Sequence, residues 1–273
     1  MTTTITHPAG ARAPVLPDRV GPLDAVRHTL TIAWRSLVQI RHNPMELGDL
    51  SLQPLMFVAL FAFVFGGAIT GSPQAFLQFG LAGIIAQNAL FLTMNTGVAL
   101  NNDITKGVFD RFRSLPIARS APLAGRIAAD VVRQVWSMAI LLGVGMVLGF
   151  RVQTNAVSVL AAVVLLVVVA GAFSWLPVLV AMVVDEPEKV MMLGFVVVFP
   201  LTFASSAFVP VATMPSWLQG WAENQPVSIV VDAARALTIG GPTSEYVIKA
   251  IIWIVGIIAV CAPIAVARYR RAV

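Results

Sequence analysis

One short segment combines charged and aromatic side chains in a way that could bind another protein. Phe109 and Phe112 lie three positions apart, beside Arg111 and Arg113. In a short helix this spacing presents apolar side chains and positive charges together, a combination suited to docking. Alternatively, the arginines anchor the chain at a membrane surface and the phenylalanine rings dip into lipid. The residues leave both interpretations open.

A second group of polar side chains lies inside a long apolar window. Gln87, Phe91 and Asn95 follow one another at four-residue spacing, which places them on one face of a helix. Amides at bilayer depth are costly unless they are paired, so this face points to protein or to a pathway and not to lipid. One interpretation is a helix-packing seam, and the other is a surface for a bulky amphipathic cargo. The candidate cargo residues are Gln87, Asn88, Phe91, Met94, Asn95, Ser205 and Ser206.

The remaining reactive residue types argue against an enzyme. His7, His28 and His42 all precede the first apolar window, so neither a histidine base nor a histidine metal ligand is available in the bilayer. The single cysteine, Cys261, excludes a disulfide framework and a cysteine-based metal cluster. No G-x-x-x-x-G-K-[ST] phosphate loop occurs in the sequence. We therefore expect no catalytic residue, metal or cofactor in this chain.

The composition indicates that the elements positioning these residues are surrounded by lipid. Of the 273 residues, 58% are hydrophobic and 11% are charged, against about 45–50% and about 25% in soluble proteins. The mean hydropathy is +0.85, so the surface must be apolar as well as the core. An ordinary water-soluble domain is excluded.

Windows without charged residues define the expected spans. A transmembrane helix needs about 20 mostly apolar residues, and the 53 residues between Asp49 and Asp103 carry no charge. Thr70-Gly71-Ser72-Pro73 is a turn signal that divides this window into two helices. The predicted fold is an all-α membrane protein with six transmembrane helices. They cover residues 53–70, 75–100, 127–150, 156–184, 190–208 and 248–267, within a transmembrane domain over 53–267.

The basic residues predict how these spans are oriented, because Lys and Arg accumulate on the cytoplasmic side. Fifteen of the 18 precede the first span, lie between the second and third spans, follow the fourth span at Lys189, or follow the last span. Arg151, Arg235 and Lys249 fall on the other side. Both termini are therefore expected in the cytoplasm. This asymmetry also accounts for the pI near 10.1 without a nucleic-acid partner.

The residues before the first span are expected to form a tail and a surface helix. Residues 1–21 predict a disordered cytoplasmic tail without a secretory signal peptide. Residues 22–43 place apolar side chains on one helical face and Arg27 and Arg35 on the other. Such a helix could lie on the cytoplasmic leaflet or pack against a soluble partner. A turn over 46–53 is then expected to lead into the first span.

Residues 209–238 predict a re-entrant helical hairpin between the last two spans. Trp217 and Trp221 share a helical face, and Trp is enriched at the headgroup level. Asn224-Gln225-Pro226 breaks that helix, and the following apolar stretch is too short to span. Asp232 and Arg235 are spaced to form an ion pair, which would lower their cost at membrane depth. An outer-surface helix with an ordinary ion pair is the alternative.

Two segments carry a recognisable family pattern. One runs from Lys106-Gly107 through Asp110-Arg111-Phe112-Arg113-Ser114-Leu115-Pro116-Ile117 to Gly125-Arg126. The other runs from Phe208-Val209-Pro210 through Met214-Pro215-Ser216-Trp217-Leu218 to Asn224-Gln225-Pro226, and then to Asp232 and Arg235. Together with the six expected spans, they resemble type 2 ABC exporter permeases, particularly the daunorubicin-resistance group. Gln225-Pro226 stands where that family more often has Asn-Pro.

The resemblance implies two permeases, expected to be identical copies, bound to two cytoplasmic ATPase subunits that hold ATP and Mg. The cytoplasmic loop over 101–126 would be the coupling segment that enters a cleft of the ATPase. Its candidate residues are Asp103, Lys106, Gly107, Phe109, Asp110, Arg111, Phe112, Arg113, Leu115 and Pro116. A smaller contact would come from Asp185, Glu186 and Glu188. A divalent-cation site at these three carboxylates is disfavoured by their exposure and the absence of a calcium-loop pattern.

The expected function is therefore that of a permease subunit of an ATP-driven exporter in a bacterial cytoplasmic membrane. The cargo would be a hydrophobic or amphipathic drug, antibiotic or lipid. Export of a lipid-linked polysaccharide is an alternative, although only two tyrosines are present to line such a channel. An ion-coupled secondary transporter is a second alternative, but it would need mid-span ionisable residues or inverted repeats, and neither is evident.

Overall fold

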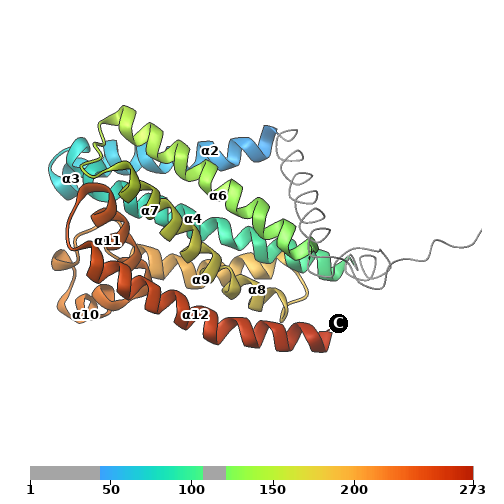
Figure 1. The fold of residues 1–273 in the computed structure, drawn as a ribbon. Helices are drawn as coiled ribbons and strands as arrows, with labels where there is room; N and C mark the ends of the chain where they lie inside the picture. Colours follow the sequence, from blue (N-terminus) through green and yellow to red (C-terminus); the bar gives the residue numbers. More distant parts are fainter. Residues whose placement is uncertain (1–43, 107–120, 273) are drawn as a thin grey trace, which may run out of the picture.

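The computed structural model describes residues 44–106 and 121–272, and every regular element in these two ranges is a helix (Figure 1). The expected surface helix over 22–43 lies outside the described residues. So does the central part of the coupling segment, which holds Gly107, Phe109, Asp110, Arg111, Phe112, Arg113, Leu115 and Pro116.

The described helices form two consecutive runs, one before residue 107 and one after residue 120. The first span is built from α2 (Pro44–Ala59), the π-helical segment η1 (Leu60–Phe65) and α3 (Gly66–Thr70). The elements that follow are α4 (Pro73–Thr105), α6 (Ala121–Leu148), α7 (Ala156–Phe173), α8 (Trp175–Ala181), α9 (Pro187–Phe203), the short 3-10 helix η2 (Val211–Thr213), α10 (Ser216–Asn224), α11 (Pro226–Ile239) and α12 (Thr243–Ala272).

Five helical stretches are long and apolar enough to cross a membrane. They are Leu52–Thr70, Pro73–Thr105, Ala129–Leu148, Ala156–Ala181 and Thr243–Ala265. The span expected over 190–208 corresponds to α9, which has 17 residues and is not one of the five. The chain is thus a multi-pass, all-α membrane protein.

Local signals in the sequence explain where the second span begins. Gly71 adopts a φ of 85°, which glycine reaches without strain, and turns the chain between the first two spans. Ser72 then caps α4, since its hydroxyl oxygen accepts a hydrogen bond from the Ala75 amide at 3.1 Å. Pro73 occupies the first helical position, where no amide donor is needed.

Two expected boundaries differ in the structure. The turn expected over 46–53 is wrong, because α2 is already helical from Pro44. A proline is favoured at the first position of a helix, so Pro44 can start a helix as well as end one. The span expected over 156–184 is present as one apolar stretch that ends at Ala181, with a break at Ser174 between α7 and α8. Pro177 lacks an amide hydrogen, so it cannot continue the helical hydrogen bonding across this point.

The long helix α4 lies at the centre of the bundle, with the other helices around it (Figure 1). The apolar window of α4 is 67% buried, whereas that of α12 is 17% buried. Small residues let neighbours approach α4 closely. A side chain at Gly83 would clash with the Ala207 backbone, and one at Gly97 would clash with Pro177. Helix α4 is therefore the structural core, and its other contacts position the polar residues considered below.

The bundle has two distinct ends, named here by what they contain. The α11 end holds α3, α10, α11 and the start of α4, and the C-terminal end holds the end of α12, the end of α4 and the turn between α8 and α9 (Figure 1). Since α4 runs the full length between them, one rigid element joins both ends.

Candidate functional site

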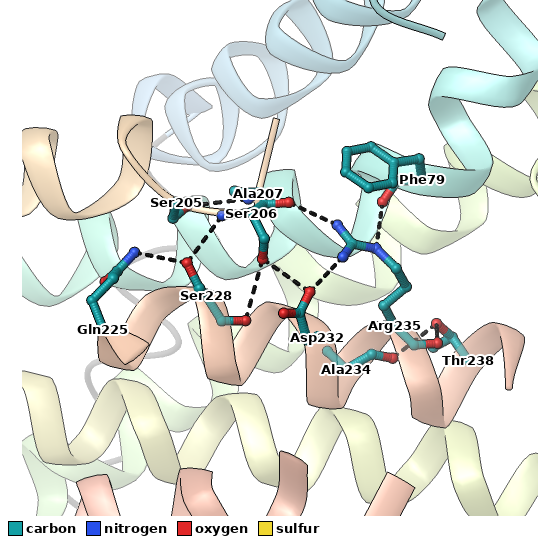
Figure 2. Close-up of polar contacts among 10 residues, drawn as sticks. All are labelled: Phe79, Ser205, Ser206, Ala207, Gln225, Ser228, Asp232, Ala234, Arg235 and Thr238. Atoms are coloured by element: carbon teal, nitrogen blue, oxygen red, sulfur yellow. Dashed lines mark hydrogen bonds and ion pairs between the residues drawn. The ribbon is translucent and has the colours of Figure 1, made fainter. Parts of the chain in front are cut away.

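A buried polar network lies at the α11 end, centred on the ion pair predicted from the sequence. The Arg235 guanidinium contacts the Asp232 carboxylate at 2.6 Å, and their side chains are 16% and 24% exposed (Figure 2). We call this the α11 network. Its members are Phe79, Ser205, Ser206, Gln225, Ser228, Asp232 and Arg235.

Arg235 connects α11 to two other segments. Its Nε donates to the Phe79 carbonyl of α4 at 3.0 Å, and a terminal nitrogen donates to the Ser206 carbonyl at 2.9 Å. The guanidinium carbon also lies 4.1 Å from the centre of the Phe79 ring, which adds a cation–π contact. A single side chain thus joins α11, α4 and the segment that follows α9 (Figure 2).

The Asp232 carboxylate is also hydrogen-bonded to the segment that follows α9. The Ser206 hydroxyl donates to the Asp232 carboxylate at 2.9 Å, and the Ser206 amide donates to the Ser228 hydroxyl oxygen at 3.0 Å. Both charges therefore have an opposite charge and additional hydrogen bonds, the condition under which a buried ion pair is tolerated.

Gln225 shapes the start of α11 with its side chain. Its Oε1 accepts a hydrogen bond from the Val227 amide at 3.0 Å, which caps the helix. Its Nε2 donates to the Leu201 carbonyl of α9 at 2.9 Å. Gln225 therefore both caps α11 and fastens it to α9.

The two short helices expected within 209–238 are present. Helix α10 begins at Ser216 and ends at Asn224, and α11 begins at Pro226. Trp217 and Trp221 lie on the exposed side of α10, with 78% and 44% of their surface accessible. By contrast, eleven of the fourteen α11 residues are buried. Asp232 and Arg235 are half-buried, and their side chains face Ser206 and Phe79 of the same bundle.

The candidate cargo residues of α4 fall into different environments. Asn88 donates to the Ser137 hydroxyl of α6 at 2.8 Å, and Met94 is buried next to Gly194 of α9. Gln87 is also buried, Phe91 is half-buried and Asn95 is exposed. Within this group Asn88 joins α4 to α6 inside the protomer, whereas Asn95 is free to face a partner or cargo.

Ser205 and Ser206 lie apart from the exposed part of that face. Both serines are buried. Ser206 belongs to the α11 network, and the Ser205 hydroxyl donates to the Thr202 carbonyl at 2.5 Å. Their neighbour Ala207 packs on Gly83 of α4, two helical turns from Phe91. They are therefore at the α11 end of the cargo face and engaged within the protomer.

A series of phenylalanine rings, which individual residue types did not reveal, runs along α9. Phe91 of α4 meets Phe195 at 5.9 Å between ring centres, and Phe195, Phe199 and Phe203 follow at 5.0 and 4.3 Å. The series continues through Phe208 to Phe61 of the first span. Phe195 and Phe199 are 46% and 40% exposed. We call these six residues the phenylalanine series. Their four-residue spacing in α9 was the available sequence signal.

A polar seam joins α4 to α6, the two helices that flank the coupling segment. The Thr96 hydroxyl donates to the Asp130 carboxylate at 3.0 Å, and Arg133 contacts the same carboxylate at 2.8 Å. Further along, the Gln134 amide is directed at the Ala89 carbonyl at 3.4 Å. The helices on either side of the coupling segment are thus tied to each other.

At the C-terminal end, Asn101 links α4 to the turn between α8 and α9. Its Nδ2 donates to the carbonyls of Ala181 and Val184 at 3.0 and 2.6 Å. The acidic residues Asp185, Glu186 and Glu188 follow directly and are all exposed. Lys106, at the other side of this tie, is exposed, and Asp103 is half-buried. The described parts of the two expected ATPase contacts therefore adjoin the same turn of α4.

The fold is that of a membrane protein: apolar helices surround the central helix α4, with polar contacts at both ends and an exposed aromatic face. Comparison with protein families identifies the family of this chain. Residues 27–239 match the model of the ABC-2 type transporter. The chain belongs to the ABC-2 type transporter family and is the membrane subunit of an ABC transporter.

The similar proteins are also permeases of ABC transporters. The chain is 38% identical to the daunorubicin resistance ABC transporter permease protein DrrB1 of Streptomyces coeruleorubidus, over 93% of this chain and 90% of that protein. It is 29% identical to the "Probable doxorubicin resistance ABC transporter permease protein DrrC" of Mycobacterium tuberculosis, over 90% of each chain. The likeness therefore extends over nearly the whole permease.

Proposed function

We propose that this permease exports a hydrophobic or amphipathic molecule, such as a drug, antibiotic or lipid, using ATP hydrolysed by a separate subunit. The observation that carries the proposal is the central helix α4. It is tied by Asn101 to the acidic turn at one end, and by Phe79 to the α11 network at the other. A movement imposed at the C-terminal end would be transmitted along one helix to the α11 end.

The proposed topology has six spans with both termini in the cytoplasm of a bacterium. Helix α9 would be the span that completes the six, the fifth in chain order. Its 17 residues rise about 26 Å, which bridges a slightly thinned or locally adjusted bilayer. In this topology the sequence assigns fifteen basic residues to the side of the C-terminal end and three to the side of the α11 end. This excess supports a cytoplasmic C-terminal end and an outward α11 end.

The coupling contacts are proposed at the C-terminal end. The segment over 101–126 would dock in a cleft of the ATPase subunit, which binds ATP and Mg, and Asp185, Glu186 and Glu188 would form a second contact. Asn101 supports this assignment because it holds both segments on one turn of α4. Motion of the ATPase would then act on α4 from two sides.

The cargo path is proposed along the exposed half of the phenylalanine series, opposite a second copy of the chain. Phe91, Phe195 and Phe199 offer flat apolar surface, and the exposed amide of Asn95 offers a hydrogen bond beside it. Planar, weakly polar molecules fit such a surface. The daunorubicin and doxorubicin resistance relatives support this class of cargo.

The α10–α11 segment is proposed to re-enter the outer leaflet. The 14 residues of α11 rise about 21 Å, which is less than the roughly 30 Å of hydrocarbon. Cysteines placed at successive positions from 227 to 238 in a Cys261→Ala chain should label slowly with an impermeant reagent from outside. Uniform rapid labelling would show an exposed outer loop instead.

Transport in inside-out vesicles tests the proposed function. Vesicles that contain this chain and its ATPase should accumulate daunorubicin when ATP is added, and a protonophore should not prevent accumulation. Replacing Phe109 and Phe112 by alanine should stop accumulation while ATP is still hydrolysed and the chain is still inserted. Accumulation that needs an ion gradient and not ATP would establish the secondary-transporter alternative.

A further inference from the structure

An apolar crevice lies between α6 and α7, on the flank of the bundle away from the phenylalanine series. Helices α4 and α11 form its floor, and the space inside it that a water-sized sphere can reach is about 30 Å³. Its lining includes Leu81, Ile85, Met138, Phe150, Val163 and Leu166. Within the described residues, α9 contacts neither α6 nor α7. The crevice is therefore separate from the proposed cargo path.

The chemistry of the lining selects an apolar occupant. Thr238 is the polar residue among the lining side chains, and its hydroxyl already donates to the Ala234 carbonyl at 2.9 Å. The accessible space is far below the about 300–1,000 Å³ of an enclosed ligand pocket, so an acyl chain would lie along the crevice with its outer side against the surrounding lipid. Leu142, Val159 and Val163 are only half-buried, so the crevice opens sideways toward lipid.

The crevice is near the α11 end of the bundle. Leu142 lies six residues before the end of α6, and Val159 lies three residues after the start of α7. The connection over 149–155 passes across this end and is fixed to α11, where the Gln153 amide donates to the Thr238 carbonyl at 3.0 Å. An acyl chain lying in the crevice would therefore have its headgroup beside this connection.

Arg151 stands on that connection, next to the crevice residue Phe150. Its backbone is held by Gln78 of α4, whose side chain donates to the Arg151 carbonyl at 2.6 Å and accepts from the Arg151 amide at 3.1 Å. One guanidinium nitrogen donates to the carbonyls of Met146 and Phe150, at 3.0 and 3.3 Å. Since a guanidinium has five N–H donors, several remain for a ligand.

The charge of Arg151 is not matched within the described residues. Arg235 pairs with Asp232 and Lys249 pairs with Glu245, both at 2.6 Å, but no carboxylate forms an ion pair with Arg151. A phosphate is the natural acceptor for an exposed guanidinium at the membrane surface. The apolar crevice and the unmatched cation are adjacent, which is the pattern of a phospholipid.

We propose that the crevice binds an anionic phospholipid, with one acyl chain between α6 and α7 and its phosphate at Arg151. The occupant is a resident membrane lipid and not the transported cargo. The lipid would cover the crevice between two helices that contact each other less extensively than each contacts α4. The proposal requires a membrane around the bundle but does not depend on ATP-driven export.

Competitive lipid retention provides the test. The full-length chain is purified in detergent and exposed to equimolar phosphatidylglycerol and phosphatidylcholine with identical acyl chains. Native mass spectrometry then measures how much of each lipid stays bound. We expect phosphatidylglycerol to be retained about tenfold over phosphatidylcholine, the discrimination of one charge-assisted contact. Arg151→Gln should abolish this preference, whereas Lys249→Gln, the same change at a paired cation on the same side, should leave it intact.

A second pair of variants tests the crevice itself. Val163→Trp, at the rim, should fill the crevice and lower retention of both lipids, whereas Val164→Trp, at a neighbouring position that is 53% exposed and outside the lining, should not. If Arg151→Gln fails to fold, Arg151→Lys replaces it. Lysine keeps the charge but lacks the forked donors of arginine, so the preference for phosphatidylglycerol should be reduced. Equal loss in Arg151→Gln and Lys249→Gln, or normal retention in Val163→Trp, overturns the proposal. Because lipid retention is measured without ATP, its failure is separable from failure of export.

Discussion

The two ends of α4 are attached to the bundle in opposite ways. At the α11 end, Arg235 alone reaches a carboxylate, two carbonyls and an aromatic ring. At the C-terminal end, Asn101 makes two hydrogen bonds through its nitrogen, but its buried Oδ1 has no partner among the described residues. Buried polar groups are normally satisfied, so Asn101 provides the weaker of the two attachments.

This difference indicates that α4 is attached rigidly at the α11 end and can shift more easily at the C-terminal end. A fully satisfied buried network is costly to rearrange, because each broken bond leaves a desolvated group. Where the hydrogen bonds are incomplete, a shift of the helices breaks fewer of them and therefore costs less free energy. We therefore expect the C-terminal end to respond to the ATPase while the α11 end keeps α11 fixed to α4.

The largest expected effect comes from breaking the ion pair. Arg235→Ala leaves Asp232 buried without its partner and should destabilise the chain by about 3–5 kcal/mol, measured by thermal unfolding in detergent. Removing both charges together, as Asp232→Asn with Arg235→Gln, should cost much less. Lys249→Ala, which breaks an exposed pair, is the control and should change the stability very little. A cost for Arg235→Ala as small as that of the control would remove the distinction between the two ends.

A smaller effect on stability but a clear effect on coupling is expected at the other end. Asn101→Ala removes two hydrogen bonds and should cost about 1–3 kcal/mol. Because Asn101 ties α4 to the acidic turn, ATP hydrolysis should continue while transport falls several-fold. The measurement is the ratio of molecules transported to ATP hydrolysed in vesicles. An unchanged ratio would mean that α4 does not transmit motion from this turn.

The polar seam between α4 and α6 should give an intermediate result. Asp130→Asn keeps the shape of the side chain but removes the charge that Arg133 and Thr96 share, which should cost about 1 kcal/mol. Transport should fall more than stability does, since the seam holds together the helices that flank the coupling segment. Glu223→Gln, an exposed position at the α11 end, should change neither property.

The smallest effect is expected at α10, which belongs to the α11 end but not to its network. Trp217 is 78% exposed, so Trp217→Ala should change the unfolding temperature in detergent very little. The corresponding stability change should stay within about 0.5 kcal/mol, as for most surface substitutions. A large loss would place the anchoring of the α11 end in α10 and not in the α11 network.

Much of the architecture could be predicted because lipid imposes simple rules on sequence. The windows without charges located the apolar helices, and Asn224-Gln225-Pro226 located the break between α10 and α11. The spacing of Asp232 and Arg235 predicted their pairing. These features depend on local sequence, where helical geometry determines which residues meet.

The partners of these residues could not be predicted, because they come from distant parts of the chain. Arg235 binds the Phe79 carbonyl, 156 positions away, and a backbone carbonyl leaves no signature in a sequence. Asn101 is bonded in the same way to Ala181 and Val184. The turn expected over 46–53 was wrong for a different reason, since Pro44 is compatible with both the end and the start of a helix. The docking role of Phe109 and Phe112 stays a prediction.

The π-helical segment of the first span has a consequence for insertions and deletions. Pro54, Val58, Ala62 and Gly66 are all buried, at a strict four-residue repeat. An ordinary helix turns about 100° per residue, so this repeat would drift by about 40° at each step and about 120° over three steps. The wider turn of Leu60–Phe65 absorbs much of that drift. Deleting one residue there would restore regular winding but rotate everything before it by about 100°. The inward-facing small side chains of α2 would then swing toward lipid, so this span should tolerate substitution far better than a change of length.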